Sequence, residues 1–252
     1  MNMPRYVWEQ HALYLTLLVF VAGCTWQPRQ PLAPPQSPPP TPPTFSCASL
    51  TESYWSEFRF GSDSPDDVAA TAAKLWGIDS DQVDFGLTID GKVYHAFWGD
   101  ADIFGAGAGY GAWFDEGQRL RKISVEWGLA KPKLSQTVEC LGGPDSYTAF
   151  YEVHGEVPFL NLALFYPQSG IIVRHSAPSW STELPHIRPI MLMKRFVVVP
   201  AGTAEQMATE MYHTGDEAPD RHHSVCLLKP WPSSIDALEI ATDEEKNKCG
   251  FS

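Results

Sequence analysis

Positive charge is scarce in this sequence. Its 252 residues include 18 Lys and Arg but 30 Asp and Glu, which gives a formal net charge of −12 at pH 7. Because a surface of this sign repels phosphate, the composition argues against a nucleic-acid partner. The basic residues that lie nearest to one another in the sequence fit a solvated strand face and loop better than an anion-binding groove. They are Arg119, Arg121, Lys122, Lys131 and Lys133.

Long apolar runs are missing as well. The one extended run, residues 12–21, is too short to span a bilayer and suits the apolar part of a secretory signal. The tetrapeptide that ends it, Val-Ala-Gly-Cys, resembles the bacterial lipobox, in which Cys24 receives a diacylglycerol and becomes a new, acylated amino terminus carrying chains such as palmitate. We therefore expect a signal peptide over residues 1–23 and a lipid anchor at Cys24. The alternative is an ordinary secretory signal in which Cys24 is incidental.

Proline is concentrated directly after this site. Residues 24–44 combine many prolines with Gln, Ser and Thr, a composition that forms neither helix nor sheet. Such a chain extends by about 3.1 Å per residue and would hold a folded domain about 50 Å from the membrane. Residues 45–252 are long enough for one sizeable core, so we expect an extracytoplasmic domain there, anchored through its lipid to a membrane of the bacterial cell envelope.

The cysteines lack the close C-x-x-C spacing of a structural zinc site. With Cys24 assigned to lipid, an even number remains, and two disulfide bonds are expected in an oxidising compartment. Four cysteines allow three pairings, all open from the sequence. We favour Cys226 with Cys249 and Cys47 with Cys140, each contributing roughly 2 to 4 kcal/mol to stability.

Catalytic and cofactor motifs are absent from the sequence. There is no Gly-x-Ser-x-Gly elbow, and the acidic residues lack the spacing of an EF-hand. The glycines at 105, 107, 109 and 111 lead into a predicted hairpin instead of a helix, so we expect a flexible loop or β-bulge and no phosphate site. We expect no catalytic residue and no cofactor.

One polar segment gathers potential metal ligands. His222 and His223 are adjacent and come after several acidic residues. Adjacent histidines point to opposite faces of a strand, so both would reach one ion only from a loop. An exposed polar loop is favoured over a metal site.

Turn and cap residues divide residues 45–252 into helices and strands. Ser64 followed by Pro65 and two aspartates predicts a helix start, and Gly77 predicts its end. Further helices are expected at 134–141 and from near Thr203, and a loop at 229–232. Strands are expected at 85–89, 93–97, 110–114, 120–127, 147–152, 159–166, 171–175 and 195–199. The fold class is therefore α+β, with an antiparallel sheet built from two helix-plus-meander units and helices packed on one face.

A family resemblance accompanies this order. Residues 134–144, Leu-Ser-Gln-Thr-Val-Glu-Cys-Leu-Gly-Gly-Pro, with strands behind them, resemble the helix and Gly-x-Pro turn of the BamE/SmpA lipoprotein domain and the related β-lactamase inhibitor protein fold. Residues 65–212 are also similar to uncharacterised bacterial lipoproteins with this element order. The long proline tether and extra cysteines depart from BamE. The resemblance implies a binding or assembly module and carries over no catalytic residue.

Aromatic residues supply the remaining candidates for a binding site. Most tryptophans should be core, but Trp98 and Trp113 flank the glycine run, and Trp180 and Trp231 lie in expected loops, where a ring could stack on a sugar or a partner. The sequence thus predicts binding of an envelope protein without catalysis. A glycan-binding module is the first alternative and an envelope hydrolase the second. Exposed rings near the glycines would favour a glycan, and paired carboxylates or histidines in a pocket would favour a hydrolase.

Overall fold

The structure is a computed structural model that describes residues 47–50, 55–77, 83–89, 91–99, 109–128, 130–154, 156–178, 186–211 and 225–251. The chain divides into two units, Met1–Thr41 and Pro42–Ser252, and every described residue belongs to the second. The expected signal peptide, Cys24 and the proline tether lie outside the described residues, as do Trp180, His222 and His223.

From Pro65 to Met211, helices and strands succeed one another in the order that the turn residues predict. The elements are η1 (Cys47–Leu50), α3 (Pro65–Trp76), β1 (Val83–Ile89), β2 (Lys92–Gly99), β3 (Gly109–Phe114), β4 (Leu120–Glu126), α4 (Leu134–Leu141), β5 (Ser146–His154), β6 (Val157–Tyr166), β7 (Ile171–Pro178), β8 (Arg195–Val198), α5 (Ala204–Met211), β9 (Lys229–Pro230), η5 (Ile235–Ala237) and α7 (Asp243–Lys248). None of the helices in these ranges is both long and apolar enough to cross a membrane.

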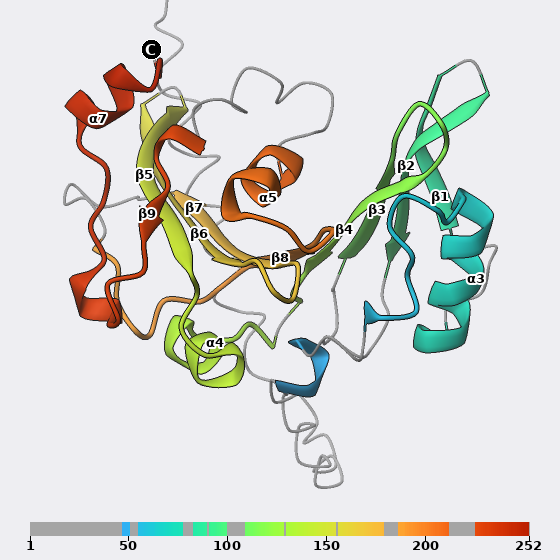
Figure 1. Cartoon of the computed structure of the whole chain (residues 1–252), viewed down its shortest axis with the longest axis horizontal. Helices are drawn as coiled ribbons and strands as arrows, with labels where there is room; N and C mark the ends of the chain where they lie inside the picture. The colour runs from blue at the N-terminus through green and yellow to red at the C-terminus, as the bar shows by residue number, and fades with distance from the viewer. Residues whose placement is uncertain are drawn as a thin grey trace, which may run out of the picture. The chain divides into compact units, whose positions relative to one another are not determined.

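The strands form one antiparallel sheet of nine in the order β1-β2-β3-β4-β8-β7-β6-β5-β9. Figure 1 shows β1 at one end of this sheet, β5 and β9 at the other, and β4 and β8 between them. The pairing of β4 with β8, from Ile123↔Val198 to Glu126↔Arg195, joins the two parts of the sheet. The protein is therefore α+β, as expected.

Helix α3 begins and ends where the sequence predicts. The Ser64 hydroxyl accepts from the Asp67 backbone, the Asp67 carboxylate accepts from the Ser64 backbone, and Pro65 opens the first turn. Gly77 ends the helix in the left-handed conformation, at φ 66°. Trp76 then packs on the sheet, with its ring 4.7 Å from the ring of Tyr110 in β3.

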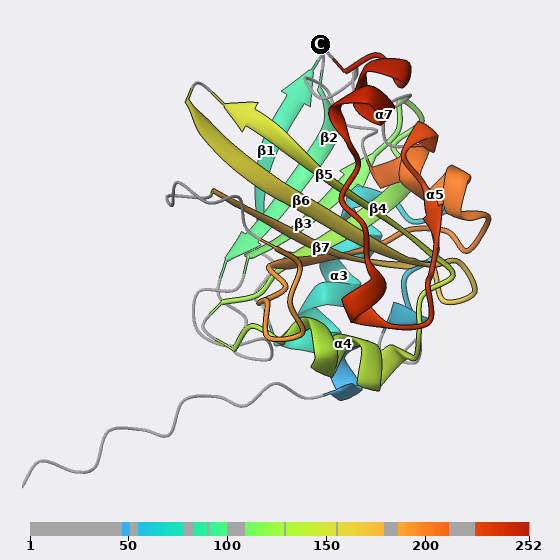
Figure 2. The same cartoon turned by 90° about the vertical axis from the view of Figure 1, so that its left-hand side faces the viewer.

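Helices cover both faces of the sheet. Buried residues of α3 and Leu134 of α4 share one core with alternate residues of the strands, whereas Met207 and Met211 of α5 pack on the opposite face, against residues such as Phe165. Figures 1 and 2 show α4 and α5 on opposite sides of the strands. The expectation of helices on one face holds for α3 and α4 but is wrong for α5, because the second face also carries an apolar patch.

The C-terminal segment adds an edge strand where a loop was expected. Lys229 and Pro230 pair with Tyr147 and Ser146 at the edge of β5. An edge strand tolerates proline because the missing N–H faces away from the ladder. Beyond it, a Thr242 capping box starts α7, so residues 225–251 form ordered structure along β5.

Both disulfide bonds form, in the pairing that we favoured from the sequence. Cys47 in η1 joins Cys140 in α4 with a Cα–Cα distance of 5.4 Å, and Cys226 joins Cys249 at the end of α7 with a distance of 5.6 Å. The first bond closes a chain segment of 93 residues and the second a segment of 23. The first bond therefore ties η1 to α4, and the second joins the two ends of the C-terminal segment.

Candidate functional site

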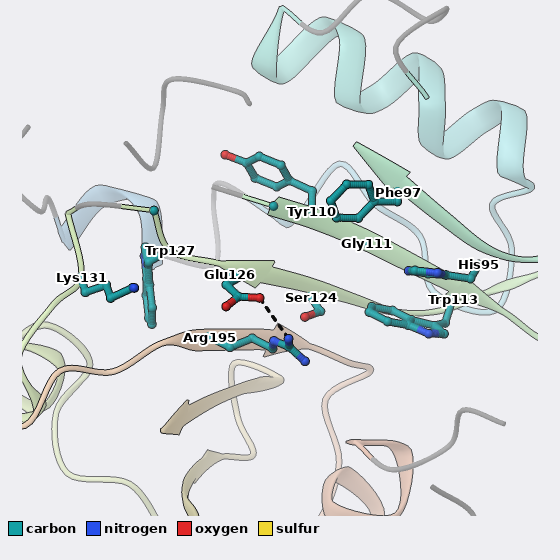
Figure 3. A pocket seen from close by; sticks show the side chains of 12 residues that line it. His95, Phe97, Tyr110, Gly111, Trp113, Ser124, Glu126, Trp127, Lys131 and Arg195 are labelled. Carbon is teal, nitrogen blue, oxygen red and sulfur yellow. Dashed lines mark hydrogen bonds and ion pairs between the residues drawn. The ribbon is translucent and has the colours of Figure 1, made fainter. Parts of the chain in front are cut away.

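The face that carries α5 is hollowed where β2, β3, β4 and β8 lie side by side. A cavity of about 520 Å³ opens there, within the size range of small-molecule sites. Figure 3 shows His95 and Trp113 at one end, Lys131 and Trp127 at the other, and Glu126 with Arg195 between them. The lining residues are His95, Phe97, Gly109, Tyr110, Gly111, Trp113, Ser124, Glu126, Trp127, Gly128, Lys131 and Arg195.

Two glycines of β3 form the floor of this cavity. Gly109 pairs with Gly99 and Glu126, and Gly111 pairs with Phe97 and Ser124, so both lie in regular strand. The expected flexible loop or bulge is therefore wrong for these two glycines, while the glycines at 105 and 107 lie outside the described residues. A strand glycine leaves backbone bare, and neighbouring rings can lie directly on it.

Three aromatic side chains lie across these glycines, and we call His95, Phe97 and Trp113 the aromatic shelf. The rings of His95 and Trp113 stack with their centroids 4.5 Å apart. A Cβ at Gly111 would lie 2.8 Å from His95 Nε2, so only glycine leaves room for this stack. Phe97 lies against Gly109 and is 44% exposed, so it offers an accessible ring to the cavity.

The surroundings of His95 favour the neutral form of its imidazole. Burial lowers its pKa below the ordinary value of 6.5, the Lys122 charge lowers it further, and Asp84 opposes both effects. Its Nε2 atom is buried and has no hydrogen-bond partner among the described residues. The ring therefore acts as an aromatic surface with one uncommitted nitrogen.

Lys122 fixes the wall of the cavity beside the shelf. Its side chain is buried, with Nζ 4.6 Å from the centre of the Trp113 ring and donating to the backbone oxygen of Met211 at 2.7 Å. A lysine ammonium group near the last carbonyl groups of a helix interacts favourably with the negative end of the helix dipole. The end of α5 is thus tied to β4, where Arg121 also pairs with Glu210. The expected solvated role is wrong for Lys122.

Charged groups line the other end of the cavity. The Arg195 guanidinium lies 3.1 Å from the Glu126 carboxylate, with side chains 43% and 53% exposed. Ser124 and Lys131 add a hydroxyl and a second cation, and Lys131 lies in the loop between β4 and α4. Among the described lining residues, Glu126 is the only carboxylate, and its pairing with Arg195 suits a role in positioning.

The tryptophans proposed as ligand contacts have different places. Trp113 lines the cavity. Trp98 belongs to β2, but its side chain, like Trp180, lies outside the described residues. Trp231 lies away from the cavity, with its ring 6.5 Å from that of Tyr147 and packed near Gly143.

Metal ligands do not gather in the described part of the chain, where no group of three His, Cys, Asp or Glu side chains is placed to hold an ion. His222 and His223 lie outside those ranges, so the metal hypothesis stays a prediction.

Sequence reasoning missed His95, Phe97 and Arg195. One signal was available for the first two, because His95 and Phe97 alternate along one strand in the same period as Gly109, Gly111 and Trp113 along the next. Arg195 carried no such signal, since its place beside Glu126 depends on the pairing of β4 with β8.

The arrangement offers several kinds of contact to a small molecule. It combines an aromatic surface, one hydroxyl, one paired carboxylate and cations within a cavity of small-molecule size. Comparison with protein-family models, curated proteins and solved structures found no match to the chain.

Proposed function

We propose that this protein is a lipid-anchored, extracytoplasmic binding protein without catalytic activity, and that its cavity binds a glycan of the cell envelope. The observation that carries the ligand class is the Phe97 ring, which is 44% exposed and lies over Gly109 inside the cavity. The C–H face of a sugar ring packs on such an aromatic surface, while its hydroxyls need polar partners at the rim. Ser124, Glu126 and Lys131 supply those partners.

The anchored location is supported by sequence and by disulfide chemistry. The lipobox-like residues 21–24 and the proline-rich residues 24–44 suit a protein held to a membrane at Cys24 by a spacer. Two disulfide bonds suit an oxidising compartment outside the cytoplasm. A glycan of the cell envelope would lie within reach of such a tethered domain.

A repeated architecture is part of the proposal. We propose that α3 with β1–β4 and α4 with β5–β8 are two copies of one helix-plus-meander unit. The strand order supports this, because β1–β4 and β5–β8 each run in chain order toward the middle of the sheet, where their last strands, β4 and β8, pair. The same arrangement supports kinship with the BamE/SmpA-like and β-lactamase inhibitor protein-like modules, in which the function is binding.

Binding of an envelope protein is the second candidate. The observation in its favour is a pair of exposed apolar side chains on the segment before β8, Ile190 at 65% and Leu192 at 47% exposure. These residues are separate from the lining of the cavity, so the two functions make different predictions.

A titration of the full chain, extracted in detergent, with neutral and acidic oligosaccharides of N-acetylglucosamine tests the glycan proposal. Phe97→Ala is expected to weaken binding by about tenfold or more, because it removes the exposed ring. Val153→Ala is the matched control, since Val153 is also apolar and is 62% exposed but does not line the cavity. Absence of binding by the wild type, or equal loss in both variants, would contradict the proposal.

A further inference from the structure

A second, smaller cavity adjoins the first. It measures about 290 Å³ and is lined by Glu126, Arg174, Ser176, Lys194 and Arg195. Glu126 and Arg195 also line the larger cavity, so the two cavities adjoin at this pair of side chains on β4 and β8. A ligand packed on the aromatic shelf would therefore meet Arg195 and, next to it, two further cations, Arg174 and Lys194. We call Arg174, Lys194 and Arg195 the cationic end.

The register of the strands places two of these cations against each other. Arg174 in β7 is the direct partner of Arg195 in β8, and Arg195 is the direct partner of Glu126 in β4. Directly opposed like charges destabilise a sheet unless a counter-charge lies between them. Glu126 provides one carboxylate, but its pair with Arg195 is exposed, and exposed pairs contribute little and exchange readily. A carboxylate bound here would be within reach of both guanidinium groups.

The cationic end stands out against the rest of the molecule. The chain carries 30 acidic and 18 basic residues, yet the described residues that line this cavity include three cations and one carboxylate. A local positive field on an acidic protein attracts anionic ligands to one place and discourages them elsewhere. Guanidinium groups also match the planar geometry of a carboxylate, which they bind with two parallel hydrogen bonds.

We infer that the ligand is an acidic saccharide, whose ring packs on the aromatic shelf and whose carboxylate binds between Arg174 and Arg195. This inference rests on the proposed function and names its ligand class. A carboxylate on a sugar has two common sources, a uronic acid or the lactyl ether of a muramic acid, and both offer the same group to the cationic end.

Calorimetric titration of the full chain in detergent distinguishes these cases. The probes are a tetrasaccharide of alternating N-acetylglucosamine and glucuronate, the disaccharide of N-acetylglucosamine and N-acetylmuramic acid, and the methyl ester of each. At least one acid is expected to bind about tenfold or more tightly than its own ester. That preference should shrink between about 50 mM and about 500 mM salt, because the cationic end is solvent-accessible.

Three arginine variants test which side chains bind the carboxylate. Arg174→Gln and Arg195→Gln should each remove most of the preference for the acid while still binding the ester, which also shows that they fold. Arg188→Gln, at an exposed arginine outside both cavities, should keep the preference.

Three outcomes would overturn the inference. Equal binding of acid and ester would agree with the proposed function but would contradict the presence of a site for the carboxylate. If both Arg174→Gln and Arg195→Gln keep the preference for the acid, the carboxylate does not bind between these two arginines. If no acid or ester binds, the proposed function fails together with the inference.

Discussion

At the scale of single residues, Gly111 controls the aromatic shelf. A Cβ there would lie 2.8 Å from His95 Nε2 and 2.9 Å from Trp113 Cη2, whereas at Gly109 the nearest atom, on Phe97, is 3.3 Å away. We expect Gly111→Ala to lower the free energy of unfolding by about 1 to 3 kcal/mol and to separate the stacked rings, with a smaller loss for Gly109→Ala. Urea denaturation measures the loss of unfolding free energy in each variant. Equal losses in the two variants would show that the contact of Gly111 with the stacked rings does not limit stability.

Histidine protonation sets a second expectation at this scale. The pKa values of His95 and His175 are lowered in the folded protein, chiefly by burial. Below about pH 6.5 the unfolded chain binds more protons at these sites than the folded chain, so the free energy of unfolding falls as the pH falls. Denaturation between about pH 7.5 and about pH 5 should show this decline, and His95→Gln should make it shallower. An unchanged slope would place the His95 pKa at its ordinary value.

Histidines and carboxylates affect the stability of the protein in different pH ranges. Hydrogen bonds from the Thr242 backbone and then Lys229 lower the pKa of Glu245 to about 2, and Ser64 lowers that of Asp67. These carboxylates stay charged until the pH falls well below the range in which histidines titrate. The stability that they contribute to the folded protein is therefore lost only at lower pH. A decline above about pH 5 is therefore assigned to histidine.

At the scale of elements, the turn between β6 and β7 depends on Gly170. A Cβ at Gly170 would lie 2.3 Å from the Val199 backbone oxygen, which comes directly after β8 and cannot rotate away. Gly77 has the same φ of 66° with open space around it, so Gly77→Ala measures the cost of the left-handed conformation alone. We expect Gly170→Ala to destabilise by about 2 to 4 kcal/mol and Gly77→Ala by about 1 kcal/mol. Equal destabilisation by the two substitutions would show that the contact with Val199 contributes nothing to the effect of Gly170→Ala.

Local signals in the sequence account for much of the element order. The Ser64 capping box and Gly77 predicted α3, and alternating apolar residues predicted the strands of the meanders. The same chemistry was present and overlooked in α7, where Thr242 is followed by Glu245 at the spacing of a capping box. Strand β9 was missed because two residues carry no periodicity, and proline argued against a strand.

Long-range pairing explains what the sequence did not reveal about the site. Trp113 was a candidate from its position near glycines, but its stack with His95 depends on the register of β2 with β3. Arg195 reaches Glu126 only because β4 pairs with a strand about seventy residues later in the chain. The face that α5 covers likewise depends on packing, since strand periodicity marks two faces without saying which helix covers each.

At the scale of the whole molecule, the disulfide bonds stabilise the domain unequally. The Cys47–Cys140 bond closes 93 residues and the Cys226–Cys249 bond closes 23, and the entropy removed from the unfolded chain grows with loop length. Replacing both cysteines of a pair with serine is expected to cost about 4 to 5 kcal/mol for the first bond and about 3 kcal/mol for the second. Chemical denaturation of the two double variants measures the difference. A larger cost for the shorter loop would show that native packing outweighs chain entropy here.

The molecule as a whole has an acidic, disulfide-bonded sheet domain, and we propose that a lipid at Cys24 anchors it to a membrane. Its cations at Lys131, Arg174, Lys194 and Arg195 and its aromatic shelf meet on one face of the sheet. Under the proposed function, this face would bind an acidic glycan, and the Glu126 carboxylate would be held in place by its pair with Arg195.

Nuclear magnetic resonance of the full chain in detergent, titrated with the N-acetylglucosamine and N-acetylmuramic acid disaccharide, examines whether the cavity binds a glycan. We expect the indole signal of Trp113 to shift on addition of the sugar and the Phe97 ring to show nuclear Overhauser effects to sugar ring protons, while the indole signal of Trp231, outside the cavity, stays in place. A saturable shift at Trp231 with none at Trp113 would show that the sugar binds elsewhere.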